Sequence, residues 1–191
     1  MKLKMKMAGM VVTAAILLFG MTGSGMAASD QIELTYDAAG IDEATCTKSV
    51  AVVTFEDKRD DVGIGESGKG KKFYSKNPVN EWVTRALYDE LKRTGCKAEY
   101  HDKKGDYNTD FTITGVVEDA YIKQKSMTKY HVNMRLNISI LKDGKKVLGK
   151  TYTSNLDKTT VPSFSFNDKV ATQTLQGILS EIVPDLHKQL K

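Results

Sequence analysis

The most restrictive feature of this sequence is a strict alternation over residues 130–140, YHVNMRLNISI, in which every second side chain is apolar. A period of two over this length predicts a β-strand with one face buried and the other face in contact with water. Asp143-Gly144 follows directly, and this dipeptide is strongly favoured in two-residue hairpin turns. Residues 146–156 are therefore predicted to pair back on the strand. Residues 109–123, which also alternate, are predicted to precede it in a three-strand meander.

A strand-helix-strand unit is predicted upstream of the meander. Ser49–Phe55 is short, β-branched and apolar at consecutive positions, as in strands that are buried on both faces. A helix should begin with Asn77 as its cap and Pro78 in its first position, and Gly95 should end it before a short strand over Lys97–Tyr100. Apolar residues recur along this helix at three- and four-residue spacing: Val79, Trp82, Val83, Ala86, Leu87 and Leu91.

Three further segments complete the predicted fold. Gln31–Tyr36 is a candidate first strand, Glu56–Lys76 is predicted to be a long surface loop, and Asp168–Leu190 is predicted to be a second amphipathic helix. Pro184 is expected to kink or divide that helix, because proline lacks a backbone donor. The sequence therefore predicts an α+β fold, a two-layer sandwich. Two amphipathic helices pack on a mixed sheet of about four to five strands, built from strand-helix-strand followed by an antiparallel meander.

The N-terminal residues have the pattern of a secretory signal peptide. Three lysines precede an apolar stretch over residues 8–21, which is shorter than the ~20 residues that span a bilayer as a helix. Gly25 and Ala27 supply the small side chains that signal peptidase requires before its cleavage point. We therefore expect residues 1–27 to be a cleaved signal and residues 28–191 to form a single domain.

The expected location of the mature protein is the periplasm. Retention of the leader as a membrane anchor and secretion are the alternatives. No cysteine lies near the expected cleavage point, so the sequence lacks the residue to which bacterial lipoproteins attach lipid. The whole chain has 28 Lys+Arg and 24 Asp+Glu, and the three lysines of the leader reduce the balance to 25 against 24. This near-neutral chain argues against a nucleic-acid partner, because such proteins are strongly basic on one surface.

The two cysteines are predicted to form a disulfide. An even number of cysteines in an exported protein favours pairing. Cys46 precedes the strand at 49–55, and Cys96 follows the helix that returns antiparallel to that strand. Both cysteines are therefore expected at the same end of the sheet, where a bridge is geometrically reasonable.

Two glycine-rich patterns resemble nucleotide-binding loops without their structural context. Residues 63–68 match G-x-G-x-x-G, but seven residues separate them from the preceding strand and no helix begins after them. Residues 65–72, GESGKGKK, have lysine where a Walker A loop needs a hydroxyl for Mg²⁺. We therefore expect a solvated lysine-rich loop and no nucleotide. Weak anion binding by Lys69, Lys71 and Lys72 remains an open alternative.

No catalytic or metal-binding set is recognised. Ser126-Met-Thr-Lys129 matches S-x-x-K, but it is predicted to lie in a turn and lacks its partner motifs. The acidic residues between 57 and 66 do not fit an EF-hand, because Val62 occupies the position of the required glycine. The histidines show no metal-ligand spacing among themselves or with the cysteines, and surface or strand-face positions are expected for all three: His101, His131 and His187.

The run from Val50 to Gly65, VAVVTFEDKRDDVGIG, resembles the opening of the YajG-like family of small bacterial envelope lipoproteins. The likeness extends over about residues 31–156, although this sequence lacks the lipobox cysteine of the family. The resemblance implies a periplasm-facing α+β domain with no established enzyme activity. Its D-x-R-x-D-like segment adds Asp57 and Arg59 to the three lysines above as candidate binding residues.

The sequence is therefore interpreted as a non-enzymatic accessory or binding protein of the envelope, without a cofactor, that contacts another envelope protein or complex. The alternative is a binder of an anionic lipid or glycolipid, using the lysines at 69–72 with Lys123, Lys125 and Lys129 at the predicted strand ends. A hydrolase with an unrecognised site is the third and weakest interpretation.

Overall fold

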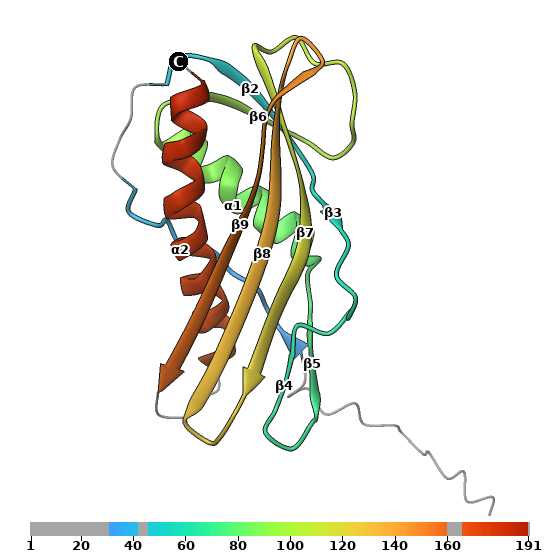
Figure 1. Ribbon diagram of the computed structural model, residues 1–191, viewed down its shortest axis with the longest axis vertical. Helices are drawn as coiled ribbons and strands as arrows, with labels where there is room; N and C mark the ends of the chain where they lie inside the picture. Colours follow the sequence, from blue (N-terminus) through green and yellow to red (C-terminus); the bar gives the residue numbers. More distant parts are fainter. Residues whose placement is uncertain (1–30, 42–45, 160–165, 191) are drawn as a thin grey trace, which may run out of the picture.

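The computed structural model describes residues 31–41, 46–159 and 166–190. The signal predicted over residues 1–27 and the loop around Pro162 lie outside this part of the chain. Within it, nine strands form one open, mixed sheet and two helices complete an α+β fold (Figure 1). The predicted fold class is confirmed. The sheet has more strands than the four to five expected.

The predicted strand-helix-strand unit is present and parallel. Strand β2 (Ser49–Val53) leads through α1 (Val79–Arg93) to β6 (Lys97–His101), which pairs with β2 in parallel from Ser49↔Lys97 onward. Strand β2 lies between β6 and β7, and its last four residues are at most 1% exposed. This position explains why its sequence is apolar on both faces. Gly95 has φ of 92° directly after the helix, a conformation that glycine adopts without a steric penalty.

The predicted meander is also confirmed. Strands β7 (Phe111–Gln124), β8 (Lys129–Lys142) and β9 (Lys145–Thr159) pair antiparallel in sequence order. Asp143 and Gly144 have φ of 50° and 72°, as the two central positions of a type I′ turn require.

The segment predicted as one long surface loop, Glu56–Lys76, instead contains three short strands. Strands β3 (Glu56–Asp57) and β4 (Gly65–Glu66) pair in parallel with successive parts of β7, and β4 also pairs antiparallel with β5 (Lys72–Ser75). Strands of two to four residues are too short to produce a detectable period. The expected loop and the expected strand number were wrong for this reason.

The first predicted strand, Gln31–Tyr36, is mostly not a strand. Strand β1 (Gln31–Ile32) pairs with β5 and then ends. Beyond this strand, side chains of other elements form the hydrogen bonds with the backbone. Asn77 accepts from the Leu34 amide and donates to the Leu34 carbonyl, both at 2.9 Å, and Trp82 Nε1 donates to the Thr35 carbonyl at 2.8 Å. Asn77 therefore binds this segment and does not cap α1, whose N-terminus has no side-chain cap.

A buried carboxylate fixes the same segment to α1. Glu90, 1% exposed, accepts from the Tyr36 hydroxyl at 2.6 Å and the Ala39 amide at 2.5 Å. Arg93 donates to Glu90 at 2.6 and 3.0 Å and to the Ile41 carbonyl at 2.7 Å. Burial raises the pKa of Glu90, but the hydrogen bonds and the charge of Arg93 outweigh it and lower that pKa overall. The ionised form is therefore stabilised in the folded protein.

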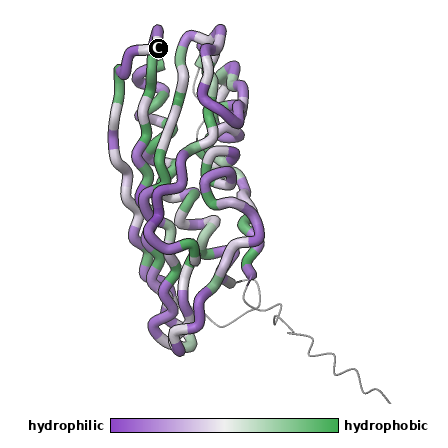
Figure 2. Tube along the Cα trace, turned by 90° about the vertical axis from the view of Figure 1, so that its right-hand side faces the viewer, coloured by the Kyte–Doolittle hydropathy of each residue, from purple (hydrophilic) through white to green (hydrophobic). Residues whose placement is uncertain are grey.

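Both helices cover the same face of the sheet, and one core joins them (Figure 1). Helix α2 (Phe166–Gln189) continues through Pro184, so the proline does not divide it. Along the long strands hydrophobic and hydrophilic residues alternate (Figure 2). The hydrophobic ones belong to the core that the strands share with the helices. The largest fully buried side chains of the meander and α2 are Ile113, Met134, Leu136, Ile138, Ile140, Leu175, Ile178, Leu179 and Ile182.

The structure contains the predicted disulfide. Cys46 and Cys96 are joined with a Cα–Cα distance of 4.6 Å, and the two residues are 7% and 6% exposed. The bridge links the chain just before β2 to the end of α1, and α2 packs on the same place through His187. It therefore connects three parts of the fold that are far apart in sequence.

Replacement of both cysteines by serine is expected to lower stability substantially. The bridge closes a loop of 50 residues, for which the loop-entropy model gives about 4 kcal/mol of stabilisation. We expect the Cys46→Ser/Cys96→Ser protein to melt several degrees lower in a calorimetric scan, and the parent protein to show no free thiol when denatured. Titratable thiols in the parent, or equal melting temperatures, would contradict the role of the bridge.

Candidate functional site

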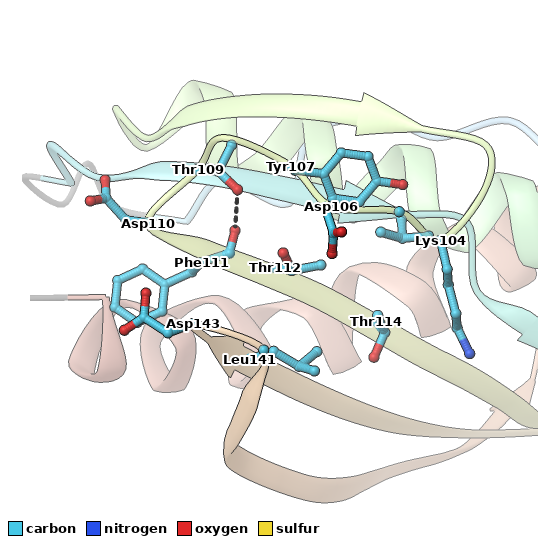
Figure 3. A pocket seen from close by; sticks show the side chains of 13 residues that line it. Lys104, Asp106, Tyr107, Thr109, Asp110, Phe111, Thr112, Thr114, Leu141 and Asp143 are labelled. Carbon is cyan, nitrogen blue, oxygen red and sulfur yellow. Dashed lines mark hydrogen bonds between the residues drawn. The ribbon is translucent and has the colours of Figure 1, made fainter.

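A hollow lies at the end of the sheet where β7 begins. It has a volume of about 410 Å³ and lies between the loop that joins β6 to β7, the first residues of β7 and the β8–β9 turn (Figure 3). Phe111 and Ile113 belong to the core beneath the helices, so Thr112 and Thr114, which alternate with them along the strand, face the opposite side of β7. The hollow, which we call the cleft, is therefore on the face of the sheet that the helices leave uncovered.

The cleft is lined by hydroxyls and carboxylates above an apolar floor. Its polar residues are Lys104, Asp106, Tyr107, Thr109, Asp110, Thr112, Thr114 and Asp143. Tyr107 is fixed by stacking on His101, with ring centroids 3.9 Å apart. Thr109 Oγ1 donates to the Phe111 carbonyl at 3.0 Å (Figure 3). This arrangement offers several acceptors and hydroxyl groups to a polar ligand.

Asp110 has a structural role within the cleft. Its carboxylate accepts from the amide and the hydroxyl of Ser49, both at 2.8 Å, at the point where β2 begins. These hydrogen bonds lower the pKa of Asp110. Asp106 and Asp143, on the two loops that border the cleft, complete its set of carboxylates.

A polar face continues from the cleft along β8 and β9. Alternate residues of β9 from Thr151 to Thr159 are exposed, and they pair with the polar residues of β8. Asn137 Nδ2 donates to Thr151 Oγ1 at 3.1 Å, and His131 Nδ1 lies 3.0 Å from Asp157 Oδ1. We call this surface the open face. It is defined by His131, Asn133, Arg135, Asn137, Ser139, Thr151, Thr153, Asn155 and Asp157.

The opposite end of the sheet carries two lysine-rich turns, which we call the basic end. In the β4–β5 turn the Ser67 amide donates to the Lys71 carbonyl, and in the β7–β8 turn the Lys125 amide donates to the Lys129 carbonyl, both at 2.8 Å. The Gly68 amide joins the two turns by donating to Gln124 Oε1 at 3.3 Å. The lysines of the basic end are Lys69, Lys71, Lys72, Lys123, Lys125 and Lys129.

Three of these lysines are paired with acids. Lys72 lies 2.7 Å from Asp61, Lys123 lies 3.1 Å from Glu66, and Lys125 lies 3.2 Å from Asp157. These ion pairs reduce the positive charge of the basic end without cancelling it. At its tip the apolar side chain of Met127 is 77% exposed between lysines 125 and 129.

The structure does not gather the five candidate binding residues at one place. Arg59 Nε and Nη2 donate to the two carboxylate oxygens of Asp57 at 2.9 and 2.7 Å. The Arg59 side chain is only 7% exposed, and its guanidinium lowers the pKa of Asp57. Strand β3, which carries Asp57, pairs with the middle of β7, whereas Lys69 and Lys71 lie beyond the end of that strand. The salt bridge to Asp61 places Lys72 between the two groups.

The two glycine-rich patterns are accounted for by the β4–β5 hairpin. Gly65 lies in β4 between β5 and β7, where a Cβ atom would stand 2.2 Å from the Ile122 carbonyl oxygen. Gly70 has φ of 76° in the turn. The glycines thus permit a close approach of strands and a tight turn. Sequence reasoning missed this role because the strands concerned are so short.

The remaining motifs have local structural roles, with one correction. Ser126 Oγ accepts from the amides of Thr128 and Lys129 at 3.4 and 3.2 Å, which is the turn chemistry expected for this segment. His187, expected on the surface, is instead 8% exposed. The apolar stripe of the last helix contains neighbours three and four residues away, so the helix buries this histidine with them.

One group of three potential metal ligands occurs in the described part of the chain: Cys46, Cys96 and His187, whose ligand atoms all lie within 4.8 Å of one another. As a disulfide, the two sulfurs are bonded to each other. The fold creates this cluster from residues separated by up to 141 positions, which no sequence spacing could reveal. None of the helices in the described residues is long and apolar enough to cross a membrane.

Comparison with known proteins supports the fold. No protein-family model and no curated protein matches the sequence. Protein XCC0632 from Xanthomonas campestris, described under the family model DUF330, is similar with a TM-score of 0.56 and 11% identity over 80% of this chain and 92% of that chain. The hypothetical protein CT253 from Chlamydia trachomatis is similar with a TM-score of 0.54 and 6% identity over 75% and 98%.

A third similar structure is lipoprotein GNA1162 from Neisseria meningitidis, with a TM-score of 0.35 and 12% identity over 74% of this chain and 96% of that chain. At these identities the first two likenesses show a shared fold. The third has too low a TM-score to support an inference about this chain.

Substitution of Gly65 by alanine is expected to destabilise the protein, because the added Cβ would collide with backbone that cannot move away. We expect a loss of about 2–4 kcal/mol in the free energy of unfolding, measured by urea denaturation. Gly68→Ala is the matched control, since its Cβ would lie 3.5 Å from the Gln124 carbonyl oxygen in ordinary contact. Equal effects at the two positions would show that Gly65 is not required by the packing of β4 on β7.

Proposed function

We propose that the protein is a non-enzymatic accessory or binding protein of the bacterial envelope, located in the periplasm, that contacts another envelope protein or complex. The leader predicted by the sequence and the resemblance to the YajG-like family support this location. The fold shared with XCC0632 is consistent with membership of such a group of small domains.

The observation that carries the proposal is the one-sided coverage of the sheet. Two helices pack on one face of the three longest strands, which have 14, 14 and 15 residues, and leave the other face polar and accessible. Amide and hydroxyl side chains on this open face can form hydrogen bonds with a partner, which offset the cost of desolvating them. The cleft supplies a concave end with an apolar floor. A partner that lies along β8 and β9 would engage both surfaces.

Site-specific photocrosslinking tests this surface. A photoreactive phenylalanine analogue at Thr153, exposed on β9, is expected to give a discrete adduct in cells that express the protein, with the partner identified by mass spectrometry. The same analogue at Ser180, exposed on the outer side of α2, is the matched control and should give only background. Adducts of equal yield from both positions, or from neither, would contradict binding through the open face.

The basic end favours a second candidate function, binding of an anionic lipid or glycolipid. Lys69 and Lys129 form no ion pair among the described residues, and Met127 lies exposed beside Lys129. Lysines around an apolar tip match the chemistry of an anionic membrane surface, where headgroups attract the charges and the interface accepts the side chain. The cleft and the basic end lie at opposite ends of β7, so variants at the two ends can separate the two functions.

The lipid candidate predicts salt-sensitive binding to vesicles. Co-sedimentation with phosphatidylglycerol vesicles should occur at low salt and disappear at about 1 M salt, where the Debye length is about 3 Å. Lys69→Glu/Lys129→Glu should weaken partitioning roughly 30-fold or more, at about 1 kcal/mol for each lysine near the surface. Lys145→Glu/Lys146→Glu, at the β8–β9 turn, changes the net charge equally and should bind nearly as well as the parent. Equal losses in both variants would indicate a non-specific charge effect.

A further inference from the structure

The cluster formed by the disulfide and a buried histidine has a chemistry that neither binding proposal uses. His187 Nε2 lies 3.7 Å from Cys96 Sγ, and all three ligand atoms of the cluster are within 4.8 Å of one another. The three residues are 7%, 6% and 8% exposed for Cys46, Cys96 and His187, respectively. Cysteine and histidine at these distances are the ligands that Zn²⁺ prefers.

We propose that the reduced form of the protein binds one zinc ion through the two cysteine thiolates and His187. Reduction by a dithiol transfers two electrons and two protons to the disulfide, which becomes two thiols, while the dithiol becomes a disulfide. Zinc then displaces the two thiol protons and forms bonds to both sulfurs and to Nε2. Each sulfur is therefore bonded to the other sulfur in the oxidised protein and to the metal in the reduced, zinc-bound protein.

The geometry around His187 fits this site. With Zn–S of about 2.3 Å and Zn–N of about 2.0–2.1 Å, tetrahedral coordination separates nitrogen from sulfur by about 3.6 Å. The Cys96–His187 separation of 3.7 Å already has this value. The sulfurs must move apart from bonding distance. Both cysteines lie outside the helices and strands, and Cys96 lies directly between the end of α1 and the start of β6.

Charge balance suits the burial of the site. Two thiolates and a neutral imidazole compensate the charge of Zn²⁺, so the cluster carries no net charge in a region that is nearly closed to water. The hydroxyl of Thr94, 1% exposed, lies 3.0 Å from His187 Nε2 and would give up this hydrogen bond when the nitrogen binds the metal. Soft thiolates favour zinc and related soft ions over the magnesium and calcium of the medium.

The site would also preserve the connections of the fold. The disulfide joins the chain before β2 to the end of α1, and His187 belongs to the last turn of α2. Zinc held by all three residues would link the same parts of the chain after the covalent bond is lost. This inference does not depend on the open face or the basic end.

The test compares oxidised and phosphine-reduced protein with zinc and with Co²⁺ as a spectroscopic probe. Native mass spectrometry should show one zinc per reduced chain and none per oxidised chain, and Co²⁺ should give thiolate-to-cobalt charge-transfer absorption only after reduction. His187→Gln should weaken zinc binding at least about 100-fold, since even an outer-shell partner contributes about 10- to 100-fold. His131→Gln, on the open face, is the matched control and should bind zinc as the parent does.

Thermal unfolding measurements test the same proposal if reduction of the disulfide destabilises the fold. Zinc should raise the melting temperature of the reduced parent and of His131→Gln, or restore their folding, and should leave reduced His187→Gln unchanged. The proposal is overturned if the reduced parent takes up no zinc, or if His187→Gln binds zinc as tightly as the parent. In the latter case the two thiols alone would account for the binding.

Discussion

The backbone of β7 is the constraint on which the rest of the structure depends. One edge of this strand pairs with β8 along its length, and the other edge pairs in turn with β2, β3 and β4. Because one strand pairs with four others, neighbouring backbones and side chains must come very close to it at certain residues. At Gly115 a Cβ would lie 2.7 Å from the Phe55 ring, and at Gly65 it would lie 2.2 Å from the Ile122 carbonyl oxygen. Two glycines therefore allow one strand to organise both halves of the sheet.

The helical layer then determines which surfaces are available for binding. Both helices pack on the same face of the sheet, and the N-terminal segment is fixed to α1 by a buried carboxylate, Glu90, with Arg93 and Tyr36. A charge buried in this way is stabilised only while its partners remain, so the segment and the helix are held as one unit. The opposite face of the meander stays polar, and the partner proposed here would bind that face.

The molecule also has two chemically different ends. The cleft and the disulfide lie where β2 and β7 begin, and the basic end lies where β7 finishes. A polar ligand, a redox-dependent metal and an anionic surface would therefore bind at separate places on the same sheet. A domain with this layout can contact a partner and a charged surface together, because the length of the long strands separates the two ends.

The sequence by itself determined the elements whose signal is repeated over many residues. The alternation of residues 130–140 and the Asp143-Gly144 turn placed the meander, and the apolar stripe from Val79 to Leu91 placed α1, because periodicity reports directly which face is buried. The cysteine pair was predictable because the order strand-helix-strand places both residues at one end of a parallel unit.

Tertiary structure alone decided the rest. The strands within residues 56–76 are too short for a period. Strands β3 and β4 exist because β7 offers them an edge, and β5 then pairs with β4. The side chain of Asn77 forms hydrogen bonds with the backbone of Leu34 and does not cap α1. The sequence could not predict this, because the N-terminal segment lies beside Asn77 only in the folded chain. The cleft and the Cys46–Cys96–His187 cluster combine residues that are far apart in sequence. Their side chains come close only when the elements pack, so a local sequence pattern cannot predict the distances between them.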